Sequence, residues 1–174
     1  ASGMPTGFSG AAVIESSATP VIAVGKAYGS GLATAFVGAS SGARYLALPY
    51  VRWATNADFA AGLGQRTFIT IQNIGSSSLA AGTVKVDYID KNGAVLATHT
   101  LGAISAGGKT NSNAGAAGLT EFGKYPDGSY GGGAIVYGPT GAELAVVGRV
   151  STQTGPSSYV SEDYNGIEIP TYIP

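Results

Sequence analysis

The stretch that decides the fold is residues 83–96, Thr-Val-Lys-Val-Asp-Tyr-Ile-Asp-Lys-Asn-Gly-Ala-Val-Leu. Apolar and polar side chains alternate along its first half, which is the period of a half-buried β-strand. The alternation predicts that Lys85 and Asp87 face water and that the core-facing residues are Val84, Val86 and Tyr88. Two apolar runs flank Asp90-Lys91-Asn92-Gly93, where Gly93 can adopt the positive φ of a tight turn. We therefore predict a β-hairpin that turns at residues 90–93.

Outward from this hairpin, the chain consists of short segments rich in Val, Ile, Thr and Tyr, separated by Gly, Pro, Asn and Ser. This composition is typical of strands and turns, and the only helical feature expected is a short turn at 114–117, within a loop over 102–118. The expected strands are 10–15, 21–27, 33–37, 44–51, 67–73, 83–90, 95–101, 133–137, 144–150 and 158–160. The predicted fold class is all-β: an immunoglobulin-like or jelly-roll-like antiparallel β-sandwich with extra N-terminal strands.

The low charge of the chain excludes several classes of function. Charged residues are 11% of the 174 residues, and nine basic against ten acidic side chains leave a formal net charge of -1. A nucleic-acid-binding surface needs clustered positive charge, so nucleic acid is not an expected partner. No apolar run reaches the roughly 18 residues that a membrane-spanning helix needs. Cysteine is absent, which removes thiol catalysis and thiolate metal sites, and we expect no cofactor.

An internal repeat with a period of roughly 120 residues divides the chain. The matching segments are 10–14 (Gly-Ala-Ala-Val-Ile) with 132–136 (Gly-Gly-Ala-Ile-Val), 21–26 (Val-Ile-Ala-Val-Gly-Lys) with 144–149 (Leu-Ala-Val-Val-Gly-Arg), and 46–49 (Leu-Ala-Leu-Pro) with 167–170 (Ile-Glu-Ile-Pro). They predict a partial unit at 1–43, a complete β-sandwich unit at 44–166 and an entry or linking strand at 167–174. The alternative is a single sandwich that contains two similar hairpins.

The middle unit is similar to a known family along most of its strands. The stretches that carry the likeness are 45–51, 67–76, 84–93, 132–136 and 161–166. They resemble the tandem immunoglobulin-like β-sandwich repeat domain of large secreted and cell-surface bacterial proteins. The resemblance covers most of 45–174 and, in partial form, 5–43, and its motifs are strand and turn signals. It implies a sandwich in an extracellular or cell-surface setting, and it transfers no catalytic residues.

The residues that could support catalysis or metal binding have simpler structural interpretations. His99, the one histidine, alternates with its neighbours on an expected strand, so we interpret it as a strand residue. The letters of Gly38-Ala39-Ser40-Ser41-Gly42 match a nucleophile elbow, but that motif needs a helix after it and an expected strand follows here. Asp87, Asp90 and Asn92 could offer oxygen ligands to Ca²⁺, although turn formation explains Asp90 and Asn92. We therefore expect no enzyme activity and no metal site.

The first 43 residues contain only two charged side chains, Glu15 and Lys26, and three apolar segments. Three strands are too few to close a sandwich, and their unpaired edges favour association. They can join the main domain, or they can complete a sheet in a neighbouring copy by strand addition, which builds a filament if it runs head to tail. A fragment of a longer tandem array has the same pattern. The predicted interface residues are Ala11, Ala12, Val13, Ile14, Val21, Ile22, Ala23, Val24, Tyr172 and Ile173.

Two functions are therefore expected for this chain. The first is an extracellular structural protein, a self-assembling subunit of a filament, pilus-like fibre or surface layer, whose partners are copies of itself. The alternative is a carbohydrate- or cell-surface-binding module of a larger secreted protein. Ten tyrosines and one tryptophan favour this alternative, because such rings present a large face and a polar tip at a wet surface. The candidate platform for surface glycans is Trp53, Tyr159 and Tyr164.

Overall fold

The computed structural model describes residues 3, 5–6, 10–29, 32–55, 64–124, 131–155 and 157–174. These residues form twelve β-strands and no helix. The strands are β1 (Val24–Gly29), β2 (Leu32–Val37), β3 (Tyr45–Leu48), β4 (Trp53–Thr55), β5 (Gly64–Asn73), β6 (Lys85–Ile89), β7 (Val95–Thr100), β8 (Lys109–Ser112), β9 (Gly133–Tyr137), β10 (Leu144–Gly155), β11 (Ser158–Asn165) and β12 (Ile167–Glu168). Within the described residues, no helix is long and apolar enough to cross a membrane.

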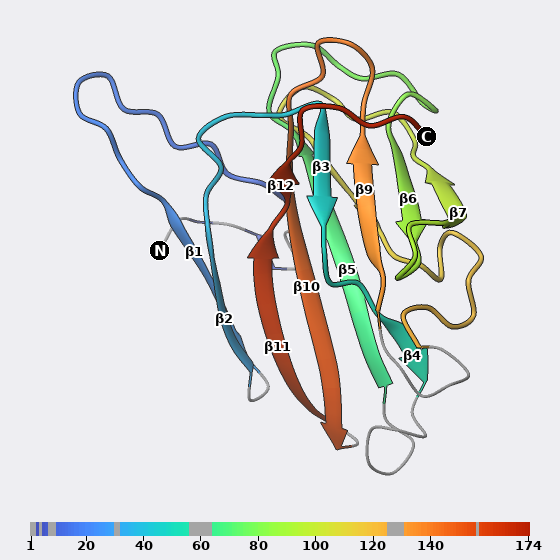
Figure 1. Ribbon diagram of the computed structural model, residues 1–174. Helices are drawn as coiled ribbons and strands as arrows, with labels where there is room; N and C mark the ends of the chain where they lie inside the picture. The colour runs from blue at the N-terminus through green and yellow to red at the C-terminus, as the bar shows by residue number, and fades with distance from the viewer. Residues whose placement is uncertain are drawn as a thin grey trace.

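Two five-stranded antiparallel sheets enclose the hydrophobic core (Figure 1). The β5 sheet has the strand order β11-β10-β5-β4, with β8 also paired to β5. The β9 sheet has the order β12-β3-β9-β6-β7. Alternate residues of each strand point into the core, among them Ile69 and Ile71 on β5 and Val136 on β9, all fully buried. The prediction of an all-β antiparallel sandwich is confirmed.

The hairpin expected at residues 90–93 joins β6 to β7. Gly93 has a φ of +90°, and its backbone N–H donates to the carbonyl oxygen of Asp90 over 3.1 Å. A carboxylate oxygen of Asp90 accepts hydrogen bonds from the backbone N–H groups of Asn92 and Ala94, each over 2.8 Å. The side chain therefore closes the turn, in the way that Asp commonly does in this position.

The expectation that Asp87 lies in water is wrong. Its side chain points to the outer face of the β9 sheet, as the alternation predicts, but the residue is only 1% exposed. Thr98 donates a hydrogen bond to one carboxylate oxygen over 2.6 Å, and Tyr172 donates to the other over 2.7 Å. Three hydroxyl groups, from Thr98, Tyr137 and Tyr172, surround the carboxylate. Tyr172 belongs to the C-terminal residues, which run over the ends of β3 and β9 toward β6 (Figure 1).

The structure differs from the expected strands at residues 10–15 and within residues 102–118. Residues 10–15 pair with no strand in the described part of the chain, although their apolar sequence predicts a strand. The loop expected over 102–118 contains the strand β8, which has a polar sequence. It pairs with β5 and buries Ser112. The turn expected at 114–117 is present, and the N–H of Leu119 donates to the carbonyl oxygen of Ala114 over 3.0 Å.

The N-terminal strands stand outside the sandwich. β1 and β2 form an antiparallel two-stranded sheet of their own, and β2 lies against β11 (Figure 1). A side-chain amide hydrogen bond fastens them, because the Nδ2 group of Asn165 donates to the carbonyl oxygen of Val37 over 2.7 Å. We call residues 10–29 and 32–38 the N-terminal arm. It supplies the extra N-terminal strands that the sequence predicts.

The C-terminal residues form a strap over the β9 sheet. β12 pairs with the outer edge of β3, with Ile167 opposite Ala47 and Glu168 opposite Leu46. The chain then continues over the ends of β3 and β9 toward β6 (Figure 1). We call residues 167–174 the C-terminal strap. Because β12 covers the edge of β3, it protects backbone groups that would otherwise be open to another strand.

Candidate functional site

The N-terminal arm exposes most of its large apolar side chains. Those that the structure leaves exposed are Val13, Ile14, Val21, Ile22, Val24, Tyr28 and Val37. Ala11 and Ala12 are exposed as well, whereas Ala23 is half-buried. Scattered exposed apolar residues are normal on a protein surface, but a cluster on one segment indicates a surface that binds something. The predicted interface residues of the arm thus lie together on one exposed segment.

The arm repeats a structural detail of the β10–β11 corner of the sandwich. Gly25 on β1 stands opposite Phe36 on β2, and Gly148 on β10 stands opposite Tyr164 on β11. In both pairs the aromatic ring lies directly on the glycine. A Cβ atom at residue 25 would lie 2.7 Å from the Cε1 atom of Phe36, and one at residue 148 would lie 2.7 Å from the Cζ atom of Tyr164. In both places the absence of a side chain leaves room for the ring.

A second detail of that corner is also repeated. The N–H of Gly38 donates to the carbonyl oxygen of Ala23 over 2.8 Å, and the N–H of Gly166 donates to the carbonyl oxygen of Val146, also over 2.8 Å. Each of these glycines follows the second strand of its hairpin directly. A Cβ atom at residue 38 would lie 3.0 Å from that of Ala23, and one at residue 166 would lie 3.1 Å from that of Val146. The arm and the corner therefore share a backbone arrangement as well as a sequence.

Equivalent positions of the two repeats differ sharply in exposure. Ile14, which matches Val136 in the sequence repeat, is 64% exposed, whereas Val136 is 0% exposed. Val21 is 57% exposed, and its match Leu144 is 0% exposed. In the complete unit these positions belong to the core between the two sheets. The arm thus has the side chains of a sandwich core at positions that the described structure leaves open to solvent.

The strap is held by backbone pairing at one end and by a buried carboxylate at the other. The N–H of Ile169 donates to the carbonyl oxygen of Tyr45 over 3.2 Å, which extends the pairing of β12 with β3. The Tyr172 ring packs against the Tyr137 ring, with the centroids 5.4 Å apart, while its hydroxyl reaches Asp87. Burial raises the pKa of the Tyr172 hydroxyl, and the Asp87 carboxylate raises it further. Ile173, by contrast, is almost fully exposed.

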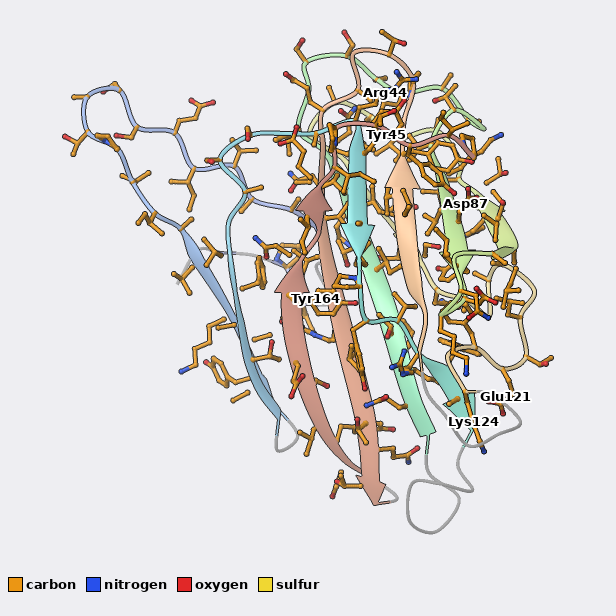
Figure 2. The ribbon with its side chains drawn as sticks, viewed as in Figure 1. Arg44, Tyr45, Asp87, Glu121, Lys124 and Tyr164 are labelled. Carbon is orange, nitrogen blue, oxygen red and sulfur yellow. The ribbon has the colours of Figure 1, made fainter. Side chains whose placement is uncertain are left out.

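The three candidate platform residues are not brought together. Tyr164 points toward the core, where its ring covers Gly148 and its hydroxyl donates to the carbonyl oxygen of Tyr50. Tyr159 is exposed on β11, at the opposite side of the β5 sheet from β4. Trp53 lies on β4, half-buried against the core, and a Cβ atom at Gly115 would be 2.7 Å from its ring. Tyr164 and Asp87 lie far apart across the molecule in Figure 2.

An aromatic residue that was not among the predicted platform residues lies beside Trp53. Phe68 on β5 packs edge-on against the Trp53 ring, with the centroids 5.9 Å apart, and is 42% exposed. The guanidinium carbon of Arg66 lies 5.0 Å from the centroid of the Trp53 ring. The alternation along β5 placed Phe68 on the face opposite the core residues Ile69 and Ile71, so the signal was present in the sequence. Of the three candidate platform residues, Trp53 thus shares an aromatic surface with Phe68.

The one histidine belongs to a buried polar chain. The Nδ1 atom of His99 lies 2.8 Å from the hydroxyl oxygen of Ser112, which lies 2.7 Å from the hydroxyl oxygen of Tyr88. Burial lowers the pKa of His99 and raises that of Tyr88. Ser112 is 1% exposed, so a substrate cannot approach its hydroxyl. The arrangement satisfies polar groups within the sandwich, as buried polar side chains require.

The remaining candidates for chemistry take structural roles. Residues 38–42 connect β2 to β3, so a strand follows the Gly-Ser sequence in place of the helix that a nucleophile elbow requires. The Asp90 side chain closes the hairpin turn. Among the described residues, no group of three or more His, Cys, Asp or Glu side chains is placed to hold a metal ion. Comparisons with protein-family models, with curated proteins and with solved structures found no match to this chain.

Proposed function

We propose that this chain is an extracellular structural protein, a self-assembling subunit of a filament, pilus-like fibre or surface layer joined by β-strand addition between copies. The observation that supports the proposal is the contrast in exposure between the two repeats. Ile14 and Val21 are open to solvent, while their matches Val136 and Leu144 are core residues. This segment has the sequence of a sandwich core, and none of the described residues forms a second layer over it, which favours a partner that supplies that layer.

Burial of the arm against such a partner would contribute a large free energy of association for a segment of this size. Burying one Val or Ile side chain fully stabilises an association by about 1.5–3 kcal/mol. The arm offers five exposed aliphatic side chains before and within β1: Val13, Ile14, Val21, Ile22 and Val24. β1 pairs on one side only among the described strands, so its other edge can accept a further strand. The low charge of the chain adds little repulsion between copies.

Replacing two exposed residues of the arm tests this proposal. The double variant Val21→Ser/Ile22→Ser should sediment as a monomer under conditions in which the wild-type chain sediments as polymers. Its matched control is Val95→Ser/Leu96→Ser, which changes two adjacent exposed aliphatic side chains on β7 and should leave polymerisation intact. Deletion of residues 1–26 should act like the arm variant. If the wild-type chain remains monomeric at every concentration, or if the deleted chain still polymerises, the proposal is wrong.

A second function is supported by the aromatic surface on β4 and β5. Phe68 and Arg66 both contact the Trp53 ring, and Phe68 exposes part of its own ring. Exposed aromatic rings can stack on sugars, so this surface favours a carbohydrate- or cell-surface-binding module as the alternative. Glycan-array binding that is lost in Phe68→Ala and kept in Tyr159→Ala would support it. Absence of saturable binding to any glycan by the wild-type chain would rule it out.

A further inference from the structure

We infer that the strand that completes the N-terminal arm is the C-terminal strap of a second copy of this chain. In that assembly Ile167 of one copy lies opposite Ile14 of the next, with Glu168 opposite Val13 and Ile169 opposite Ala12. The inference rests on the proposed function, since it requires that copies associate. It goes further by naming the donated strand, the accepting segment and the register between them.

The register follows from the contacts that β3 makes inside the complete unit. β3 pairs with β9, with Leu46 opposite Val136, Ala47 opposite Ile135 and Leu48 opposite Ala134. Residues 134–136 match 12–14 in the sequence repeat, and residues 46–48 match 167–169. Transferring the pairing from one repeat to the other places the strap beside residues 12–14. The aliphatic residues Ile167 and Ile169 then take the places of Leu46 and Leu48.

β3 also covers the corner that the arm repeats. A Cβ atom at Gly148 would lie 2.9 Å from Cδ2 of Leu48, and one at Gly166 would lie 3.3 Å from the Cβ atom of Leu46. The β10–β11 corner is thus shaped to receive a Leu-x-Leu strand against its two glycines. The arm has the same two glycines, at residues 25 and 38, with the same backbone hydrogen bond. An Ile-x-Ile strand from another copy fits the same corner.

The chain offers this strand from its own surface. Within one copy the strap is held by two residue pairs with β3, by the Ile169–Tyr45 hydrogen bond and by the bond from Tyr172 to Asp87. Ile167 is 57% exposed in that position. Transfer to the arm of another copy replaces two residue pairs and the Ile169–Tyr45 bond by three residue pairs, and it covers Ile167 and Ile14 together. Because donor and acceptor lie on different surfaces, the contact is head-to-tail and extends into a filament.

Two single-cysteine variants test the register directly. The chain has no cysteine of its own, so each variant carries a single thiol. A disulfide between an Ile14→Cys chain and an Ile167→Cys chain therefore reports the contact between these two positions. Directly opposite residues in antiparallel strands have Cα atoms about 4.5–5.5 Å apart, within the range that a disulfide spans. An affinity tag on one variant distinguishes the mixed dimer from the two homodimers. Under mild oxidation the mixed dimer should exceed either homodimer several-fold.

A shifted pair provides the matched control. Val13→Cys mixed with Ile167→Cys moves one cysteine by a single residue, which turns it to the opposite face of the strand. This mixture should give no excess of mixed dimer. Polymers that form without an excess of the Ile14–Ile167 dimer would overturn the inference while leaving the proposed function standing. A wild-type chain that never polymerises would instead overturn the proposed function.

The Tyr172→Phe variant provides an independent test that does not use disulfides. It keeps the ring against Tyr137 and removes only the hydrogen bond to Asp87. Since a hydrogen bond to a charged group is among the stronger kind, the released strap should become about tenfold or more populated. Polymerisation should therefore accelerate in this variant, and it should slow in Ile167→Ser/Ile169→Ser. An unchanged rate in both variants would show that the strap is not the donated strand.

Discussion

Substitution of Gly148 by alanine should destabilise the sandwich, because the added methyl group has nowhere to go. Its Cβ atom would lie 2.7 Å from Cζ of Tyr164 and 2.9 Å from Cδ2 of Leu48. Neither neighbour can retreat easily, since Leu48 is 1% exposed and the Tyr164 hydroxyl is hydrogen-bonded to the Tyr50 carbonyl. Real side chains essentially never show such contacts, so the core must shift.

The expected cost follows from two opposing effects. Overpacking a core destabilises the folded state by about 1–3 kcal/mol. Replacing glycine by alanine also lowers the conformational entropy of the unfolded chain, which stabilises the folded state by about 0.4–1 kcal/mol. The free energy of unfolding should therefore fall by about 1–2 kcal/mol. For a domain of this size the melting temperature should fall by about 2–8 °C. Urea denaturation followed by the fluorescence of Trp53, the one tryptophan, measures the change.

Gly25→Ala is the matched control for this prediction. The added Cβ atom approaches the Phe36 ring even more closely, but Phe36 is only half-buried on a hairpin outside the sandwich. The ring can swing away, and the free energy of unfolding should change by less than about 0.5 kcal/mol. In a Tyr164→Leu background, Gly148→Ala should lose most of its cost. A Gly148→Ala chain as stable as wild type would refute the packing argument.

Three further predictions concern the sandwich itself. Ser112→Ala should lower the free energy of unfolding by about 1–3 kcal/mol, because it leaves the buried Tyr88 hydroxyl without a partner; equal stability in urea would contradict this. Burial lowers the pKa of His99 from 6.5, so the unfolded chain binds the proton more readily, and stability should decrease as the pH falls through 6.5 toward the lowered value. His99→Gln should flatten that slope in urea titrations; an identical slope would exclude His99 as its source. Gly93→Ala should cost about 1 kcal/mol, since Gly93 has a φ of +90°, and a thermal melt that matches wild type would contradict the strained turn.

Local patterns in the sequence predicted the centre of the fold. The alternation in residues 83–88 predicted Val84, Val86 and Tyr88 as core residues, and all three are fully buried. The Asp90–Gly93 turn was predicted because its residues determine its geometry locally. These features depend on neighbours in the sequence, so a single sequence is enough to find them.

Features that depend on distant residues escaped prediction. Asp87 is buried by Tyr172, which lies 85 residues further along the chain, and nothing near Asp87 in the sequence indicates that cover. β8 was missed because its strand is defined by pairing with β5, while Lys109, Thr110 and Asn111 give no apolar alternation. Trp53, Tyr159 and Tyr164 were grouped by residue type, which carries no information about the face on which each ring lies.

The strap also determines how the molecule responds to force. A pull on residue 174 reaches the Tyr172–Asp87 hydrogen bond first, because that is the described contact nearest to this end. The load then passes to the Ile169–Tyr45 bond and to the two residue pairs of β12, and only afterwards to Gly166 and its bond to Val146. If these contacts break in this order, β12 leaves the edge of the β9 sheet, while the β5 sheet and the pairing among β3, β9, β6 and β7 remain. In a single copy pulled from this end, the strap would therefore extend and dissipate work before any sandwich unfolds.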